Sequence, residues 1–111
     1  MAIRIRPVAG EQLGILAGSN ALDLEDSGVV HFAIEIADDA ELDALCHARR
    51  AMLREERTRG RQWDEPSLEE AVFTRSEISW RVRPGQRSWC LQKIEELNDR
   101  SNQLLRATAG V

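Results

Sequence analysis

DDAELDALCHARRAMLREERTRG, residues 38–60, is the stretch that decides the fold, and its pattern predicts one long helix. Asp38 stands three residues before Glu41, which is the spacing of a capping box, where side chains satisfy free N–H groups of the first turn. Acidic residues fill the first turns and arginines fill the second half, which is the order that the helix dipole favours. Gly60 then provides a natural stop.

This helix has one apolar face, which predicts that it packs on another element. The apolar residues, which recur at spacings of three and four, are Leu42, Leu45, Cys46, Met52 and Leu53. Arg49 interrupts the face, and its aliphatic stem can lie along apolar surface while the guanidinium reaches outward. We therefore expect Leu45 and Leu53 to be core positions.

Two stretches before the helix have the alternation that is typical of strands. In VVHFAIEIA, residues 29–37, one side carries Val30, Phe32, Ile34 and Ile36, and the other carries Val29, His31, Ala33 and Glu35. Residues 3–7 alternate isoleucine with arginine, and Pro7 ends that short strand. We predict a small antiparallel sheet with the helix on its apolar face.

The segment after Gly60 admits two interpretations. Ser67 stands three residues before Glu70, which favours a second helix over residues 67–82. The competing interpretation is a strand, in which the alternating residues are Ile78, Trp80 and Val82. We favour the helix, which the following Pro-Gly pair would end.

Residues 86–109 predict a long C-terminal helix. Its apolar stripe consists of Cys90, Leu91, Ile94, Leu97, Leu104 and Leu105, with Asn98 and Ser101 inside it. Together the elements predict an α+β fold in a single domain, residues 1–111. A small N-terminal antiparallel sheet would pack on the central helix, and an αα-hairpin with the long C-terminal helix would follow.

Cysteine usage and the N-terminal sequence predict a cytoplasmic protein. Cys46 and Cys90 both fall on predicted apolar helix faces, so we expect buried free thiols and no disulfide. The first residues, MAIRIRPVAG, contain no apolar core of a signal peptide. No apolar run approaches the length of a membrane span, so we expect no membrane contact.

Basic charge is concentrated in the second part of the chain. The net charge is −4, but residues 1–48 hold nine acidic residues and two arginines, whereas residues 49–111 hold ten acidic and thirteen basic residues. We favour pairing of these surfaces within the fold or across a dimer. The alternative is nucleic-acid binding, not favoured by the net charge, through Arg49, Arg50, Arg54, Arg57, Arg59, Arg61, Arg81, Arg83 and Arg87.

No catalytic or cofactor motif is present. The sequence contains no GxGxxG, P-loop, HExxH or CxxC pattern. We therefore expect no catalytic residue, no cofactor and no metal ion. A second alternative is a small-molecule or metal site near His31, but Glu35 points to the same side about two pleats away and does not complete such a site alone.

The phrase VVHFAIEIADDAELDAL, residues 29–45, resembles the opening strand and helix of a glyoxalase-type (vicinal oxygen chelate) half-module. In that family the histidine of the strand is a metal ligand, so the resemblance implies this role for His31. The half-module continues with further strands that are closed by a carboxylate ligand. The present sequence departs from it, because helices are predicted after residue 60.

The sequence thus favours a small non-catalytic interaction or regulatory protein that acts through helical surfaces as a homodimer. Phe73 and Trp80 fall opposite the apolar face of the helix predicted over residues 67–82, where no internal partner is evident. Exposed aromatic residues grouped on one face indicate a subunit contact. The predicted interface consists of Phe73, Trp80, Leu91, Ile94, Asn98 and Leu105.

Overall fold

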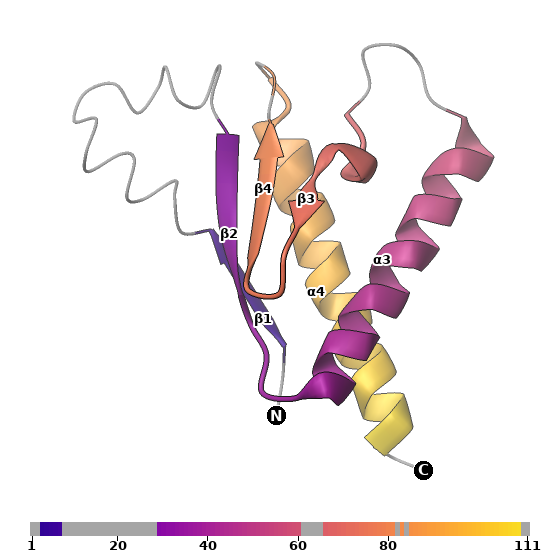
Figure 1. Ribbon diagram of the computed structural model, residues 1–111. Helices are drawn as coiled ribbons and strands as arrows, with labels where there is room; N and C mark the ends of the chain where they lie inside the picture. Colours follow the sequence, from indigo (N-terminus) through magenta and orange to yellow (C-terminus); the bar gives the residue numbers. More distant parts are fainter. Residues whose placement is uncertain (1–2, 8–28, 61–65, 82, 84, 110–111) are drawn as a thin grey trace, which may run out of the picture.

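The computed structural model describes residues 3–7, 29–60, 66–81, 83 and 85–109. Its elements, in chain order, are β1 (Arg4–Pro7), β2 (Val29–Glu35), α3 (Asp39–Arg59), the 3₁₀ turn η2 (Leu68–Glu70), β3 (Val72–Phe73), β4 (Glu77–Arg81) and α4 (Arg87–Ala109). Figure 1 shows the strands side by side, with α3 and α4 as two long crossing helices. The predicted α+β class and the long C-terminal helix are confirmed.

The four strands form one antiparallel sheet in the order β1-β2-β4-β3. The inner strand β2 pairs with β1, where Ile5 lies opposite Ile34, and with β4, where Phe32 lies opposite Ile78. The predicted antiparallel pairing of the two N-terminal strands is confirmed. The hairpin of β3 and β4 adds two strands on the other side of β2.

One face of the sheet carries the core. Its buried apolar residues form a single cluster of Ile3, Ile5, Val30, Phe32, Ile34, Ala44, Leu45, Ala48, Met52, Leu68, Ala71, Ile78, Trp80, Cys90, Ile94 and Leu97. The predicted inward faces of both N-terminal strands are therefore correct. Because α3 and α4 both contribute to this one cluster, they cover the same face of the sheet, and α3 also packs directly against α4.

The ends of α3 follow the predicted capping logic. The carboxylate of Asp38 accepts a hydrogen bond from the backbone N–H of Glu41 at 3.0 Å. The carboxylate of Glu41 reaches back to the N–H of Ala37 at 2.8 Å. Gly60 ends the helix with a φ of 77°, a backbone conformation that favours glycine. These local contacts fix where the helix begins and ends.

The buried side of α3 is rotated relative to the predicted apolar face. Leu45 and Met52 are buried as expected, but the rest of the buried side consists of Glu41, Ala44, Ala48 and Glu56. Leu42 and Leu53 are half-buried, and Cys46 is exposed. The close approach of α4 explains the difference, since small alanines let two helices pack tightly while larger side chains flank the contact.

The helix predicted over residues 67–82 is wrong, and the competing strand is correct for β4. Ser67 opens only the single turn η2, and β3 and β4 follow as a hairpin. Ile78 and Trp80 alternate inward and are fully buried, whereas Val82 lies outside the described residues. Pairing with the free edge of β2 stabilises this strand, and such tertiary contacts override local helix signals. The helical pair is therefore α3 with α4.

The two cysteines differ in environment, so the expectation of two buried thiols is wrong for Cys46. Cys90 is buried, and this burial, with the nearby charge of Glu70, raises the pKa of its thiol to about 11. An unfolded cysteine has a pKa of about 8.5. The stability that follows from this shift is therefore present below about pH 8.5 and is lost as the pH rises towards 11.

We expect a thiol reagent such as dithionitrobenzoate to label one cysteine of the folded protein at pH 8. Cys46 is exposed and reacts through its thiolate, whereas Cys90 stays protonated and inaccessible. After unfolding in guanidinium chloride, both cysteines should react. The measurement is the absorbance of the released thiolate, with Cys46→Ser as the control that should show no rapid labelling. Rapid labelling of the Cys46→Ser protein would contradict the burial of Cys90.

Candidate functional site

The face of the sheet that is turned away from the helices, which we call the outer face, has no described element over it. By strand alternation and register it consists of Arg4, Arg6, Val29, His31, Ala33, Glu35, Val72, Glu77, Ser79 and Arg81. Charges of both signs are present beside exposed apolar side chains. Val29 is 38% exposed and Val72 is 62% exposed. The outer face is therefore a mixed surface that can contact another molecule.

His31 lies in the middle of the outer face with two partners from β4. Its Nδ1 is 2.6 Å from a carboxylate oxygen of Glu77 and 3.1 Å from the hydroxyl of Ser79. The strand register sets this arrangement, because Ser79 lies opposite His31 and Glu77 is two residues earlier on the same side of β4. The histidine is thus held in one orientation by the neighbouring strand.

This cluster does not form a catalytic relay. In a Ser-His-acid relay, the serine and the carboxylate contact different nitrogens of the imidazole ring. Here Ser79 and Glu77 both contact Nδ1 of His31. The described residues also contain no group of three or more His, Cys, Asp or Glu side chains that could hold a metal ion. Among the described residues, the potential ligand that contacts His31, the histidine to which the glyoxalase resemblance assigns a metal, is Glu77.

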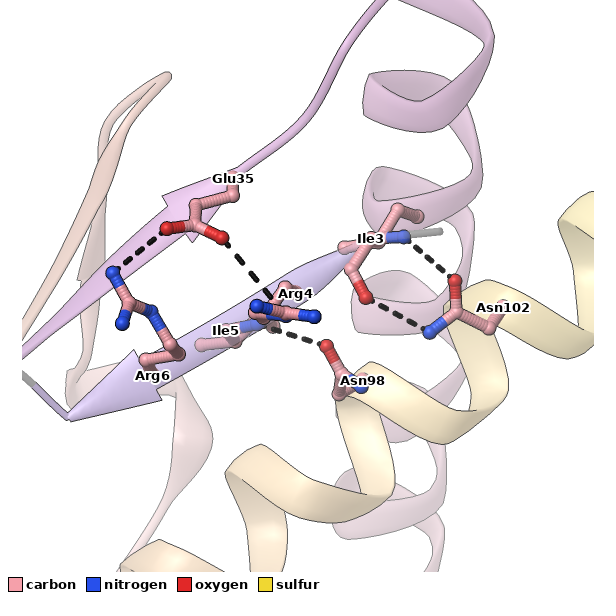
Figure 2. A network of polar contacts seen from close by, with 7 residues as sticks. All are labelled: Ile3, Arg4, Ile5, Arg6, Glu35, Asn98 and Asn102. Atoms are coloured by element: carbon pink, nitrogen blue, oxygen red, sulfur yellow. Dashed lines mark hydrogen bonds and ion pairs between the residues drawn. The ribbon is translucent and has the colours of Figure 1, made fainter. Parts of the chain in front are cut away.

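The β1 side of the outer face carries an ion-pair cluster. Arg6 donates a hydrogen bond to Glu35 at 2.8 Å, and the Nε of Arg4 lies 4.0 Å from the other carboxylate oxygen of Glu35 (Figure 2). The side chains of Arg4, Arg6 and Glu35 are 69%, 56% and 47% exposed to solvent, so each ion pair contributes little to stability. Their position at the sheet edge instead sets the charge that a partner would meet.

The edge of β1 that does not pair with β2 forms hydrogen bonds with side chains of α4 (Figure 2). The amide of Asn102 accepts from the N–H of Ile3 at 2.8 Å and donates to its carbonyl at 3.0 Å. Asn98 accepts from the N–H of Ile5 at 2.9 Å. These asparagines therefore take the place of a neighbouring strand and cover an edge that would otherwise pair with another chain. The sequence alternation gave no sign of this role.

We expect Asn102→Ala to lower the free energy of unfolding by about 1–2 kcal/mol, because it removes two hydrogen bonds to β1. Hydrogen exchange at the amide of Ile3 should also become faster, since its acceptor is lost. Urea denaturation and exchange detected by NMR would measure the two effects. Gln103→Ala is the control, since Gln103 is the next residue and is exposed. Equal effects in both variants would rule out this role for Asn102.

The arginines of α3 that the nucleic-acid hypothesis names are partly engaged within the fold. The guanidinium of Arg49 lies over the ring of Phe73, 4.3 Å from its centre. Arg57 pairs with Glu69 at 3.3 Å, and Arg50 contacts His47 at 3.3 Å. Arg54 and Arg59 are exposed on the same helix.

The remaining arginines of the nucleic-acid hypothesis do not belong to α3. Arg81 is exposed at the end of β4, Arg83 is exposed beyond it, and Arg87 is half-buried at the first position of α4. Arg61 lies outside the described residues. Base stacking would need exposed tryptophan rings, but Trp80 is buried, and the ring of Trp89 packs edge-on against it with 5.7 Å between the ring centres. Trp63 lies outside the described residues. Nucleic-acid binding stays a prediction.

The predicted interface residues are mostly part of the core. Trp80 and Ile94 are buried, and Phe73, Leu91 and Leu105 pack against the same cluster. The premise that Phe73 and Trp80 lack internal partners is therefore wrong, because the predicted helix that set them apart does not form. Asn98 is engaged with β1. The homodimer and its contact surface stay predictions, although the buried side chains of Trp80 and Ile94 are not accessible to a partner.

Comparison with known proteins gave no assignment, because no protein-family model, no curated protein and no solved structure matches this chain. Neither α3 nor α4 has an apolar stretch of the kind that a membrane span requires.

Proposed function

We propose that this chain is a small, non-catalytic, cytoplasmic interaction domain that associates with a second copy of itself through the outer face of the sheet. The observation that carries this proposal is a sheet with described helices on one face only. Its other face has exposed Val29 and Val72 beside charges of both signs. A surface with arginines and glutamates together can be self-complementary, which an isologous dimer requires.

The helices offer less to a partner than the sheet does. Their large apolar side chains face the core. Among the described residues of α3 and α4, the exception is Leu104, which is 42% exposed. The two helices are also joined by an ion pair, in which Arg100 of α4 donates two hydrogen bonds to Glu55 of α3 at 2.6 and 2.8 Å. This pairing lowers the pKa of Glu55 and raises the pKa of Arg100.

Light scattering across a dilution series that starts at tens of micromolar tests the proposal. The wild type should have about twice the 12.5 kDa mass of one chain at the higher concentrations. Val72→Asp and Val29→Asp should each raise the dissociation constant by about tenfold or more, because they place a new charge in the contact. Both positions are exposed in the single chain, so the fold should tolerate the changes.

Leu104→Asp is the matched control, because Leu104 is exposed on α4 and lies away from the outer face. This variant should associate as the wild type does. A monomeric mass for the wild type throughout the series would overturn the proposal. A dimer that is weakened only by Leu104→Asp would move the contact to the C-terminal helix.

A further inference from the structure

On β4, the outer face carries two opposite charges at equal distances from Ser79. Glu77 is two residues before Ser79 and Arg81 is two residues after it, and all three side chains lie on the outer face. At about 3.4 Å per residue, each charged residue is about 7 Å from Ser79 along the strand. A half turn about an axis that crosses β4 at Ser79 therefore exchanges the positions of the two charges.

Both charged side chains retain the capacity to bind a further partner. Arg81 is exposed and forms no ion pair with another described residue. The side chain of Glu77 is 50% exposed, and one of its carboxylate oxygens lies 2.6 Å from Nδ1 of His31. Because a carboxylate can accept several hydrogen bonds through its two oxygens, Glu77 can bind a guanidinium while it contacts His31.

The apolar residues of the outer face follow the same symmetry. β4 lies between β2 and β3 (Figure 1), where Ser79 is opposite His31 on one side and Val72 on the other, so these residues form one row across the sheet. Val29 and Ala33 are two residues on either side of His31 along β2. The same half turn therefore places Val72 against its own counterpart in a second copy and Val29 against the partner's Ala33.

We infer that two copies of this chain pack their outer faces together about a two-fold axis along this row, so that Glu77 of each copy binds Arg81 of the other. This inference rests on the proposed self-association and names the residues that set its register. Sheets that pack face to face lie about 10 Å apart with their strands aligned to within about 30°. The long side chains of glutamate and arginine can meet across that spacing. The pair then occurs twice, as an isologous contact requires.

The charges on β1 do not share this symmetry. Arg4 and Arg6 lie on one side of the row through Ser79, and β1 has no described residue on the other side, because the strand ends at Pro7. Both arginines already lie beside Glu35 of the same chain. The contact is therefore centred on β2, β4 and β3, with β1 at its rim.

Charge reversal in separate chains tests the pairing. Glu77→Arg gives the contact two cations, and Arg81→Glu gives it two anions, so each variant alone opposes like charges twice. The dissociation constant of each should rise by about tenfold or more, because like charges opposed across an interface are costly. Mixing the two variants restores both opposite-charge pairs, so they should bind each other about as tightly as the wild type binds itself. Fluorescence anisotropy of a chain labelled at Cys46, which is exposed on α3, measures these constants.

Two further pairs of variants control for net charge and for folding. Arg54→Glu and Glu95→Arg make the same changes of net charge at exposed positions of α3 and α4. Each should associate as the wild type does, and their mixture should not favour the heterodimer. Glu77→Gln and Arg81→Gln remove one charge without reversing it and should weaken association less than the reversals. They keep the test decisive if circular dichroism shows that a reversal disturbs the fold, because wild-type affinity in both glutamine variants would overturn the pairing.

The outcomes distinguish the inference from the function on which it rests. Weakened association of both reversal variants, with recovery in their mixture, supports the pairing of Glu77 with Arg81. A wild-type dimer that both reversals leave unchanged, or a mixture that binds no better than either variant alone, would overturn the pairing and leave the self-association standing. A monomeric wild type at every concentration would overturn both.

Discussion

Trp80→Ala should lower the free energy of unfolding by about 3–5 kcal/mol, which is the usual cost of removing a large aromatic side chain from a core. Trp80 has no exposed surface, belongs to the core cluster and packs against the ring of Trp89 at 5.7 Å. A loss of this size is a large fraction of the stability of an ordinary domain. Urea denaturation followed by far-ultraviolet circular dichroism would measure it.

Trp80→Phe is the matched control for this variant. It keeps most of the ring and removes the indole N–H, which is buried and has no acceptor among the described residues. We therefore expect a much smaller loss than for Trp80→Ala. Similar midpoints for Trp80→Ala and the wild type would show that β4 does not lie in the core.

Glu56→Ala should lower the free energy of unfolding by about 2–4 kcal/mol, because it leaves buried hydrogen-bond donors without an acceptor. The carboxylate of Glu56 is buried near the C-terminal end of α3. It accepts from the hydroxyl of Ser67 at 2.8 Å and from the N–H of Leu68 at 3.0 Å. It therefore ties the chain that enters η2 to α3. Urea denaturation would measure the loss.

The neighbouring residue supplies a matched control. Glu55→Ala removes the ion pair with Arg100, but the side chain of Glu55 is 58% exposed, so the cost should be about 1 kcal/mol or less. Glu56→Gln keeps one oxygen acceptor and should fall between the two alanine variants. A cost for Glu55→Ala equal to or above that for Glu56→Ala would show that burial of the carboxylate does not matter.

Two similar capping signals begin elements of very different length, which shows that a local signal can start a helix but does not set how far it continues. Asp38 with Glu41 and Ser67 with Glu70 have the same spacing, yet the first begins a helix of 21 residues and the second begins a single turn of three. After the second signal, the chain meets the free edge of β2 and the carboxylate of Glu56. Backbone pairing with β2 and the burial of Ile78 and Trp80 then outweigh the local preference for a helix.

In the candidate site, too, the sequence predicted the features that depend on local alternation but not those that depend on tertiary contacts. Alternation along residues 29–35 correctly placed His31 on the solvent side of its strand, because side chains of a strand alternate between two faces. It could not show that Glu77 and Ser79 lie beside His31, since that depends on the register of β2 with β4. The sequence also could not show the roles of Asn98 and Asn102, because Ile5 and Ile3, to which they bind, lie 93 and 99 residues away along the chain.

The elements that local contacts stabilise can be recognised from the amino-acid sequence. Caps, charge order and a terminal glycine delimit α3, strict alternation defines β1 and β2, and a long apolar stripe defines α4. Three other features follow from contacts between distant parts of the chain: the rotation of α3, the pairing of β3 and β4 as strands, and the binding of β1 by α4. Those outcomes depend on which surfaces meet in space, and contacts between distant residues leave no periodic trace along the chain.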